Sequence, residues 1–436
     1  MSRPTRPTLA VVGGGWAGLA TAVRATEAGH AVTLYEMAAR PGGRAREVLH
    51  DGVPLDNGQH ILIGAYRETL ALMRTVGADP DALLERRPLT LVDPAGRGLR
   101  LPPGPAIPAF VRGVLAARHW PWRSRLALLR AALRWRRQGF RAAPQTTVAD
   151  LTGSLPRDVQ AGLIEPLCVA ALNTPAAQAS AQVFLRVLHD ALFGGPGAAD
   201  LLLPRVSLSA LLPEPAARWL DARGAALRWG ERVRSLQPRV DAPGWQLDGQ
   251  PFDAVVLACS AGEAARLTTG IAPDWSATAA AFDYEPIVTV YLASPGSRLA
   301  QPMTALSESD RHPAQFVFDL GALDRSGTRD GLFAFVISGA RVWLDRGLEA
   351  TTQATLRQAT EAFALQTWRA PLRVVRSLAE RRATFSCTPG LRRPLAAIAP
   401  GLVAAGDHVD GPYPATLEGA VRSGIDAIGR LARPSH

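Results

Sequence analysis

The sequence contains no lysine, so every one of its basic side chains is an arginine. The 48 arginines exceed the 38 acidic residues and give a formal net charge of +10. A basic balance is compatible with nucleic acid, an anionic membrane surface or an acidic substrate, so the charge alone selects no partner. No nucleic-acid recognition motif accompanies the charge, and we therefore expect no nucleic-acid partner.

Cysteine and long hydrophobic runs are also scarce. The three cysteines, Cys168, Cys259 and Cys387, are widely spaced and form no Cys-x-x-Cys motif, so we expect reduced thiols and no metal site. Glycines interrupt the first apolar run at Leu9–Val12, which excludes the hydrophobic region of a signal peptide. No run approaches the length of a transmembrane helix. The sequence therefore predicts a cytoplasmic protein, and its 436 residues allow about two to three domains.

A glycine-rich turn lies near the start of the chain. Thr8–Val12 is predicted to form a buried strand, and the following residues fit the pattern G-x-G-x-x-G before a helix over Leu19–Glu27. The first glycine allows a tight turn, the second lets the backbone approach a pyrophosphate, and the third lets the helix pack on the strand. The helix N-terminus favours phosphate. The predicted cofactor-binding residues here are Gly13, Gly15, Trp16, Ala17 and Gly18.

Acidic and basic residues follow at distances that suit a dinucleotide. A second strand over Ala31–Tyr35 leads to Glu36, which is placed to accept hydrogen bonds from a ribose without a 2'-phosphate. Arg40–Arg46 then reads R-x-G-G-R-x-R, in which glycines bring the backbone near the ligand and Arg44 can meet phosphate. These residues alone leave FAD and NAD both open.

Two further segments complete the expected nucleotide site. The polar cluster Asp56–His60 precedes an apolar stretch and is close enough to the phosphate site to face a cofactor ring. Near the C-terminus, a short strand over Gly401–Ala405 ends at Gly406 and Asp407, and a helix is predicted over Thr416–Ile428.

These motifs together resemble the amine oxidase and phytoene desaturase superfamily of FAD enzymes. The resemblance implies an α/β fold, with a discontinuous Rossmann-type FAD-binding domain and an α+β substrate-binding domain. It also implies that Glu36 binds the adenosine ribose, Arg44 and Asp407 contact the pyrophosphate region, and the backbone of Val233 contacts adenine. The remaining cofactor contacts that it implies are Gly58, Gln59, His60, Gly406 and Leu417.

The chain divides accordingly into interleaved segments. We expect residues 1–87, 205–270 and 395–436 to form the FAD-binding domain. The substrate-binding domain would come from residues 88–204, which read as mainly helical, and residues 271–394, which read as mixed strands and helices.

Three reactions are open to such a flavoenzyme: amine oxidation, desaturation of a polyprenoid, and delivery of hydride from reduced flavin to carbon. Amine oxidases of the superfamily usually place a lysine near the flavin, which this sequence cannot do. The motifs Leu55–Tyr66, Glu165–Cys168 and Ala171–Pro175 are similar to those of the hydroxysqualene dehydroxylases of bacterial hopanoid and carotenoid pathways. That resemblance implies reductive cleavage of the C–OH bond of hydroxysqualene, a hydrophobic C30 isoprenoid, to squalene.

The chemistry that the resemblance implies needs a proton for the departing hydroxide and a dry, apolar pocket. His60 is our first candidate for the acid, Glu165 a second, and Asn173 a hydrogen-bonding group that orients them; Asp407 and His408 are further proton-donor candidates. A purely structural histidine, and a helix N-terminal charge at Glu165, are the competing interpretations. A polyprenoid desaturase and a non-enzymatic flavin-bearing scaffold remain alternatives, and no motif identifies an electron donor.

The positive charge concentrates in one stretch. Residues 94–149 contain no aspartate or glutamate, and arginines alternate there with Trp120, Trp122, Trp135 and several leucines. Such a mixture is typical of amphipathic helices in a lipid headgroup layer, so we expect membrane-facing helices within residues 105–141 and a peripheral position on the inner face of the cytoplasmic membrane. A helix packed on the core with a solvated basic face is the alternative.

Overall fold

Two sheets organise the computed structural model, which describes residues 6–50, 52–364 and 367–431. The first sheet has six strands in the order β10-β2-β1-β14-β21-β20. Their bounds are Ala226–Trp229, Ala31–Glu36, Thr8–Val12, Ala254–Leu257, Leu402–Ala404 and Ala397–Ala399, respectively. All neighbours are parallel except β20, which pairs antiparallel with β21. Strands from both ends of the chain are therefore adjacent in one sheet.

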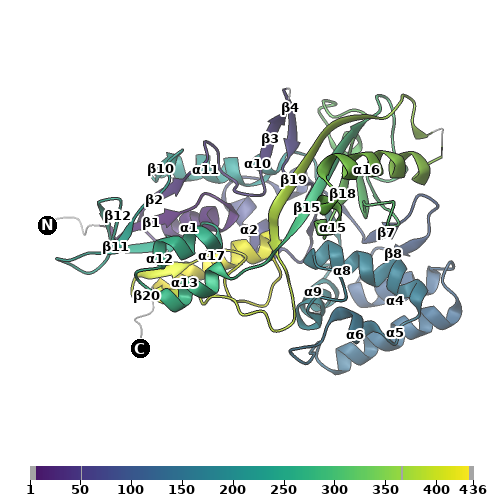
Figure 1. Ribbon diagram of the computed structural model, residues 1–436, viewed down its shortest axis with the longest axis horizontal. Coiled ribbons are helices and arrows are strands. Elements are labelled where there is room, and N and C mark those ends of the chain that lie inside the picture. The colour runs from purple at the N-terminus through teal and green to yellow at the C-terminus, as the bar shows by residue number, and fades with distance from the viewer. Residues whose placement is uncertain (1–5, 51, 365–366, 432–436) are drawn as a thin grey trace.

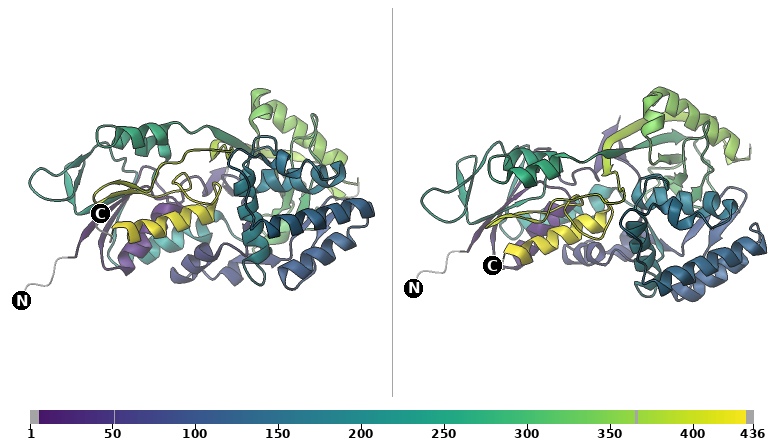
Figure 2. Two further views of the ribbon diagram at one scale, coloured as in Figure 1. Left: turned by 90° about the horizontal axis from the view of Figure 1, so that it is seen from below. Right: turned by 60° about the horizontal axis from the view of Figure 1, so that its bottom comes forward.

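Helices cover both faces of this sheet, as a parallel sheet requires. On one face α1 (Trp16–Glu27) lies against α17 (Leu417–Leu431), and α11 (Pro213–Asp221) packs beside α1. Figure 2 shows α1 and α17 side by side. The other face is covered by α12 (Ala261–Thr268), α13 (Pro273–Ala280) and a small antiparallel sheet. The strands of that sheet are β11 (Leu236–Pro238), β12 (Trp245–Leu247) and β13 (Gln250–Phe252).

The second sheet is antiparallel, in the order β16-β17-β18-β15-β19. Its strands span Met303–Ala305, Phe316–Asp319, Leu332–Ile337, Tyr284–Ala293 and Arg373–Phe385. The long strands β15 and β19 pair with each other and rise from the centre of the molecule (Figure 1). Alternate side chains of β15 face opposite ways, so Val288 and Val290 pack toward α16 (Leu348–Ala362) and Tyr291 packs toward the other face.

A helical layer covers that other face. It consists of α4 (Ala106–Ala116), α5 (Trp122–Arg137), α6 (Val148–Thr152), α7 (Arg157–Val159), a π-helix at Gln160–Ile164, α8 (Glu165–Leu172) and α9 (Ala181–Phe193). Its buried side chains form one cluster with Tyr291, Phe316 and Phe318 of the sheet. Among the described residues, no helix is both long and apolar enough to cross a membrane.

Shorter elements complete the two bodies. They are β3 (Glu47–His50), β4 (Val53–Asp56), β5 (Leu62–Ile63), α2 (Arg67–Thr75), α3 (Pro80–Leu83), β6 (Leu84–Arg87), β7 (Thr90–Val92), β8 (Gly98–Arg100), β9 (Leu201–Pro204), α10 (Leu208–Leu211), α14 (Leu320–Leu323) and α15 (Arg341–Asp345). Strand β9 lies between β5 and β6 in an antiparallel sheet. Residues 201–204, which the sequence assigns to the substrate-binding part, are thus hydrogen-bonded to strands assigned to the FAD-binding part.

The predicted α/β fold with a second, mixed body is confirmed. The strand predicted at Thr8–Val12 has those bounds, and the segment predicted at Ala31–Tyr35 forms β2 with one residue more. The first helix begins at Trp16, three residues before the predicted start, because the glycine turn leads into it directly. Cys168, Cys259 and Cys387 form no disulfide.

Candidate active site

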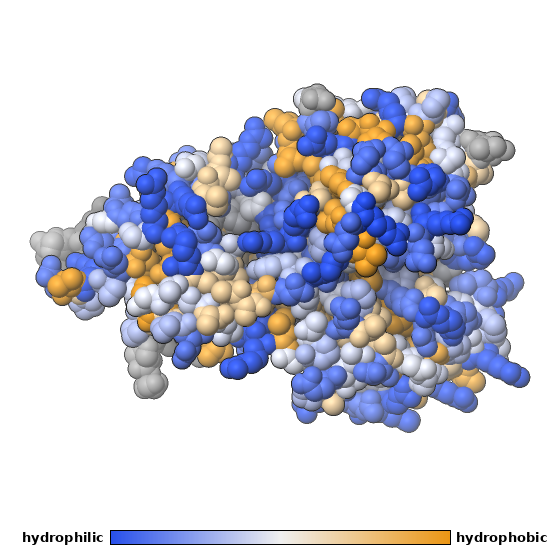
Figure 3. Space-filling model, in the orientation of Figure 1, coloured by the Kyte–Doolittle hydropathy of each residue, from blue (hydrophilic) through white to orange (hydrophobic). Residues whose placement is uncertain are grey.

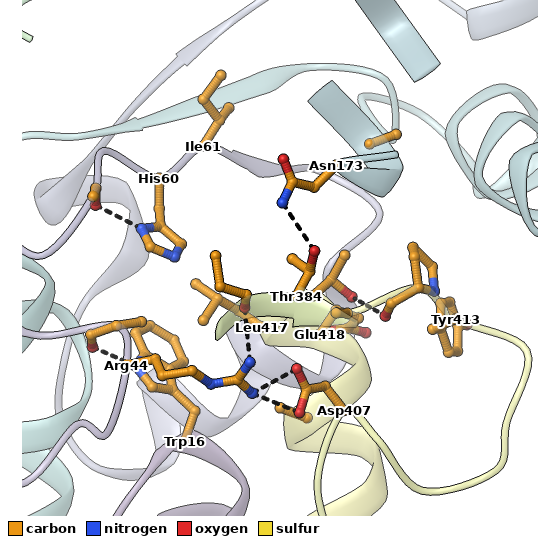
Figure 4. Close-up of a pocket in the computed structure, with 18 of the residues that line it drawn as sticks. Trp16, Arg44, His60, Ile61, Asn173, Thr384, Asp407, Tyr413, Leu417 and Glu418 are labelled. Carbon is orange, nitrogen blue, oxygen red and sulfur yellow. Dashed lines mark hydrogen bonds and ion pairs between the residues drawn. The ribbon is translucent and has the colours of Figure 1, made fainter. Parts of the chain in front are cut away.

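A cavity of about 750 Å3 runs between the two bodies, with lining residues from both. One end is formed by the turns that follow β1, β2 and β21. The other end is lined almost entirely by aliphatic and aromatic side chains of the helical layer and the antiparallel sheet. Figure 4 shows the region where the two ends meet, with His60 and Asn173 above Arg44 and Asp407. Among the described residues, no three His, Cys, Asp or Glu side chains gather closely enough to hold a metal ion.

The glycine turn lies at the first end, and each glycine has a steric reason. A Cβ on Gly13, whose φ is +112°, would lie 2.5 Å from the carbonyl oxygen of Ala258. A Cβ on Gly18 would lie 1.8 Å from the carbonyl oxygen of Gly13, so α1 approaches β1 as closely as the sequence predicts. Gly15 instead faces the cavity, with only the Cα of Gly43 within 4 Å. No side chain caps α1, and its first N–H groups are thus free to meet an anion.

Glu36 ends β2 and holds the glycine turn in place. Its Oε2 accepts a hydrogen bond of 2.7 Å from the N–H of Gly14, and its Oε1 accepts one of 2.8 Å from the N–H of Ala38. The carboxylate is buried and lines the cavity. Each carboxylate oxygen has a second lone pair, so Glu36 can accept further bonds from ribose hydroxyls without losing its backbone partners.

Arg44 and Asp407 form an ion pair, although 363 positions separate them in the sequence. Both oxygens of the Asp407 carboxylate accept from Nη2 of Arg44, at 2.7 and 2.6 Å. Arg44 also donates to the carbonyl of Ala383 on β19. Asp407 raises the pKa of Arg44; burial opposes ionisation of Asp407, but the charge of Arg44 outweighs it and holds the carboxyl pKa well below its usual range. A fixed cation and a fixed anion therefore stand together beside the glycine turn.

Val233 lies where a second part of a dinucleotide would extend. It is buried and lines the cavity beyond Glu36. Its carbonyl oxygen already accepts from the Arg266 guanidinium at 2.8 Å. A base could still contact the backbone of Val233 through its N–H or through the second lone pair of that carbonyl oxygen.

The segment Gly58–His60 reaches the junction between the two ends of the cavity. The Nδ1 of His60 lies 2.8 Å from the carbonyl oxygen of Gly58, and since a carbonyl only accepts, Nδ1 carries the proton. Burial lowers the pKa of His60, the hydrogen bond to Gly58 opposes this, and the positive charge of Arg44 lowers the pKa further. The lowered pKa favours the neutral imidazole, in which Nε2 is a hydrogen-bond acceptor. A proton-donating role for His60, which the sequence favours, requires it first to gain a second proton.

Asn173 lines the same junction but is fully engaged by the protein. It ends α8 in a left-handed conformation with φ +49°, which asparagine tolerates better than most residues. Its Nδ2 donates to Thr384 Oγ1 and to the carbonyl of Glu285, at 2.9 and 3.1 Å, and its Oδ1 accepts from the N–H of Gly339. Both amide hydrogens are committed, so Asn173 positions the cavity wall and cannot donate to a ligand.

Glu165 lies apart from the other predicted site residues. It begins α8 and pairs with the Arg157 guanidinium at 2.5 Å, with 41% of its side chain exposed. It does not line the cavity, although its neighbours Ile164 and Leu167 do. This geometry matches the helix N-terminal charge that was the competing interpretation, and it does not support a role in proton transfer.

The remaining predicted cofactor residues, Gln59, Gly406 and Leu417, all line the cavity. Sequence reasoning missed three others. Glu418 is buried, and its carboxylate accepts hydrogen bonds from the N–H groups of Glu68 and Thr69 at the start of α2. Thr384 and Thr289 lie on the antiparallel sheet and line the cavity at the junction. The signal for Thr289 is a threonine between two valines, Val288 and Val290, in the buried stretch of β15.

The residues present fit a dinucleotide cofactor. The uncapped N-terminus of α1, the glycine that leaves space at position 15, and the acidic end of β2 provide for phosphate and ribose in the order expected of such folds. The Gly42 and Gly43 loop packs directly on the turn, since Gly42 N–H donates to Gly14 O at 2.8 Å.

Comparisons with known proteins agree with this arrangement. The family model for flavin-containing amine oxidoreductases matches residues 16–431. The hydroxysqualene dehydroxylase of Rhodopseudomonas palustris is 29% identical over 96% of this chain and 96% of that protein. The enzyme of the same name from Zymomonas mobilis is 28% identical over 96% of this chain and 97% of that protein. Zeta-carotene desaturase of a Synechocystis species is 40% identical, but over only 20% of this chain and 18% of that protein.

Solved structures share the fold at low identity. An oxidoreductase from Methanosarcina mazei has a TM-score of 0.73 and 15% identity, covering 97% of this chain and all of that chain. Cyclohexylamine oxidase from Brevibacterium oxydans has a TM-score of 0.67 and 18% identity, covering 98% of this chain and 99% of that one. The predicted FAD cofactor is confirmed with the family. The chain belongs to the flavin-containing amine oxidoreductases and is an FAD-dependent oxidoreductase related to the hydroxysqualene dehydroxylases.

Proposed function

We propose that this chain removes the hydroxyl group of hydroxysqualene reductively to give squalene, as a step of hopanoid or other triterpenoid synthesis. The observation that carries the proposal is that the cavity is continuous. Its cofactor end, formed by the turns after β1, β2 and β21, opens into an end with apolar walls, which we call the apolar chamber. The hydroxysqualene dehydroxylases align with nearly the whole chain, whereas the zeta-carotene desaturases align with a fifth of it. Both points support a hydrophobic isoprenoid substrate.

The chamber has the chemistry of a hydrocarbon site. Its walls come from the helical layer, the antiparallel sheet and the β7–β8 hairpin, and most of its side chains carry no polar atom, the indole N–H of Trp135 being an exception. The apolar side chains include Leu89, Leu91, Leu99, Leu101, Phe110, Leu128, Phe140, Leu163, Leu167, Leu188, Met303, Phe316, Phe318 and Leu378. An apolar chain gains free energy by leaving water for such a surface, at about 25 cal/mol per Å2 buried.

The reaction replaces a C–O bond with a C–H bond. Reduced FAD, when bound, supplies the hydride, and the oxygen leaves as water once it has taken up a proton. Hydroxide is a poor leaving group, so the proton must arrive as the bond breaks, and the apolar walls would keep water from the electron-poor carbon. The protein's own tasks are to place the C–O bond at the junction, to hold one mobile proton there, and to exclude solvent.

Two of the predicted proton-donor candidates remain. Arg44 holds Asp407 as a carboxylate, and Glu165 lies outside the cavity. His60 and His408 both line it, and His408 Nε2 is buried with no hydrogen-bond partner among the described residues. We assign the proton to Nε2 of His60, because that atom lies at the junction. A negative charge beside a histidine favours its protonated form. An anionic cofactor would therefore raise the pKa of His60 and favour a proton on Nε2.

A pair of anaerobic incubations tests the proposal. Holoenzyme that has been reduced with dithionite is mixed with hydroxysqualene, and oxidised holoenzyme is mixed with squalene and an artificial electron acceptor. We expect squalene from the first mixture and no product from the second. The alternative, a polyprenoid desaturase, predicts the opposite outcome. A variant that lacks the mobile proton, His60→Phe, should retain FAD while losing at least about a hundredfold in single-turnover rate.

We also propose that the α4–α5 face docks on anionic membrane. Four large apolar side chains project into solvent there: Val111, Leu115, Trp122, which is 59% exposed, and Leu133. Exposed arginines surround them at positions 112, 118, 123, 130, 134, 136, 137 and 141. Figure 3 shows this region, at the lower right, as mainly hydrophilic with isolated apolar patches. Such a surface would sit in the headgroup layer and place the apolar chamber close to lipid.

Two of the tryptophans that were expected to face lipid are buried. Trp120 and Trp135, which the sequence suggests as lipid-facing, are 2% and 3% exposed and belong to the core, as does Leu128. Amphipathic α5 turns Leu128 and Trp135 inward because the helix packs on α4 and α7, and Trp120 is buried just before its start. The apolar contribution to docking thus comes from Trp122 and three aliphatic side chains.

Co-sedimentation with phosphatidylglycerol vesicles at low salt tests the docking face. The variant Arg134→Gln, Arg136→Gln, Arg137→Gln should bind at least tenfold more weakly than the parent, since each basic residue near the surface contributes about 1 kcal/mol. The matched control Arg357→Gln, Arg373→Gln, Arg376→Gln changes the net charge equally, on α16 and β19. Equal losses in the two triple variants would mean that net charge, and not this face, causes the binding.

A further inference from the structure

Thr289 is a buried hydroxyl without a hydrogen-bond partner. It lies in the middle of β15, is 1% exposed, and its Oγ1 finds no partner among the described residues. Leaving such a group unpaired costs about 1 to 3 kcal/mol. The cost is informative here, because a valine at this position would have nearly the same shape and suits a central strand at least as well.

The surroundings of Thr289 are aliphatic and belong to the cavity. Its partners across the two neighbouring strands are Val336 on β18 and Leu378 on β19, and both line the cavity, as Thr289 does. Ile287, two residues earlier on the same face of β15, lines it too. The hydroxyl is thus the one polar atom among these four side chains on the cavity wall.

His60 lies near Thr289, beside Gly58. The position that a Cβ would take on Gly58 is 3.9 Å from Thr289 Oγ1 and 3.8 Å from His60 Cε1. Cε1 is bonded to Nε2, the nitrogen that the Gly58 carbonyl leaves unprotonated. The unpaired hydroxyl and the imidazole that carries the unpaired acceptor therefore both border the space beside Gly58, and both residues line the cavity.

We propose that Thr289 and His60 form an alcohol-binding pair that recognises the hydroxyl of an otherwise hydrocarbon substrate. The inference rests on the proposed function and adds the residue that distinguishes the alcohol from the hydrocarbon. An alcohol both donates and accepts one hydrogen bond, and the pair offers an acceptor at His60 Nε2 and a donor at Thr289 Oγ1.

The pair stays complementary in both protonation states of His60. When the imidazole is neutral, the substrate O–H donates to Nε2 and its oxygen accepts from Thr289. When the imidazole is protonated, Nε2 donates to the substrate oxygen, and Thr289 can then accept the substrate O–H, because a threonine hydroxyl serves in either direction. The substrate oxygen therefore keeps a partner up to the moment at which it takes the proton and leaves as water.

Such a pair also explains how the reaction product would be released. Squalene has no hydroxyl, so binding it leaves both Thr289 and Nε2 unpaired, whereas the alcohol satisfies both. Sites built around a hydroxyl can reject the analogue without it by large factors, because their own polar groups lose their partners.

Binding to oxidised holoenzyme, where no turnover occurs, tests the inference. Dissociation constants for hydroxysqualene and for squalene are measured from the flavin absorbance change in a common detergent. We expect the parent to prefer the alcohol, Thr289→Val to reduce that preference at least tenfold, and Thr289→Ser to retain it. Thr304→Val, a buried threonine of the same sheet outside the cavity, is the matched control and should change nothing.

Two results would overturn the inference. One is an unchanged alcohol-to-hydrocarbon ratio in Thr289→Val. The other is a ratio that changes only together with the FAD dissociation constant or the flavin spectrum, which would place the hydroxyl against the cofactor instead. If Thr289→Val does not fold, Thr289→Ala provides the same deletion of the hydroxyl.

The outcome is separable from that of the proposed reaction. Failure of reduced parent enzyme to form squalene would refute the reaction while leaving a Thr289-dependent preference for the alcohol measurable. Squalene formation without any Thr289 dependence of binding would support the reaction and refute the pair.

Discussion

At the scale of single residues, the two nitrogens of His60 have different roles. Nδ1 is tied to the Gly58 carbonyl and only Nε2 is available to a ligand. The same backbone bond that fixes the ring also fixes the tautomer. The identity of the residue at position 60 could be read from the sequence, but its protonation depends on burial and on Arg44, which no local pattern reports.

The lowered pKa of His60 predicts a pH dependence of stability. In the folded protein the pKa lies below the value of about 6.5 expected in the unfolded chain. Between these two values the unfolded chain binds more protons, so the stabilising effect is present above about pH 6.5 and is lost as the pH falls through the folded value. For protein freed of FAD, the free energy of urea unfolding should therefore fall more between pH 7.5 and 5 in the parent than in His60→Phe. Parallel curves would contradict this prediction.

Asn173 predicts a graded loss of stability. Asn173→Ala removes three hydrogen bonds and leaves a β-carbon in a left-handed conformation, so we expect a loss of about 3 to 5 kcal/mol in the free energy of unfolding. Asn173→Gly removes the same bonds but tolerates the backbone, and should be about 1 kcal/mol more stable than the alanine variant. Chemical denaturation measures both. Equal losses would show that the conformation carries no strain.

Sequence reasoning succeeded for residues whose role follows from backbone geometry and failed for those whose role follows from tertiary contacts. Gly13 and Gly18 make the close approaches that their spacing indicates, and Glu36 ends β2 beside them, because strand, turn and helix are local. Glu165 did not reach the cavity, because the rotation of α8 about its axis is decided by packing. Thr289 went unnoticed, since its significance lies in the absence of a partner.

At the scale of elements, the contact between α1 and α17 joins residues from opposite ends of the chain. A Cβ on Gly424 of α17 would lie 2.2 Å from the carbonyl oxygen of Ala17, and the Thr21 hydroxyl donates to the carbonyl of Gly424. Both Ala17 and Leu417 line the cavity, so the spacing of these helices also sets the width of the cofactor end.

Two glycines of α17 should respond in opposite ways to alanine. Gly424→Ala should push α17 away from α1, lower the free energy of unfolding by more than about 2 kcal/mol, and weaken FAD binding. Gly429→Ala lies in the same helix with nothing within 4 Å of the new Cβ, and should stabilise by about 0.5 to 1 kcal/mol. Thermal unfolding and FAD titration would measure both variants. Destabilisation by Gly429→Ala would mean that helix propensity is not the relevant difference.

At the scale of the whole molecule, the cofactor region draws on the first, middle and last thirds of the chain. Gly13 and Glu36, then Val233, then Asp407 all line one cavity. The sequence indicated a strand in each segment, and the resemblance to the superfamily placed Val233 and Asp407 at the cofactor. It did not predict that β9 would pair with β5 and β6, since a run of three leucines specifies a buried strand but not its neighbours.

FAD should therefore stabilise the molecule as a unit. A ligand that binds only the folded state adds about 1.4 kcal/mol for each tenfold excess over its Kd, so the Tm of the parent should rise steadily with added FAD. Arg44→Ala should need at least ten times more FAD for the same rise, because it removes the cation beside the phosphate region and leaves the buried Asp407 carboxylate unpaired. A Tm that does not depend on FAD concentration would contradict this account.

The order of strands in the six-stranded sheet has a consequence for synthesis in the cell. Strand β21 is the neighbour of β14, and the turn that follows it carries Asp407. During translation, α1 and the glycine turn leave the ribosome long before this strand exists. The growing chain thus exposes a half-built sheet with an open edge until β21 has been made, and the full cofactor site is in place only after residues 402–431 have emerged. A chain that stops before β21 should therefore not retain FAD.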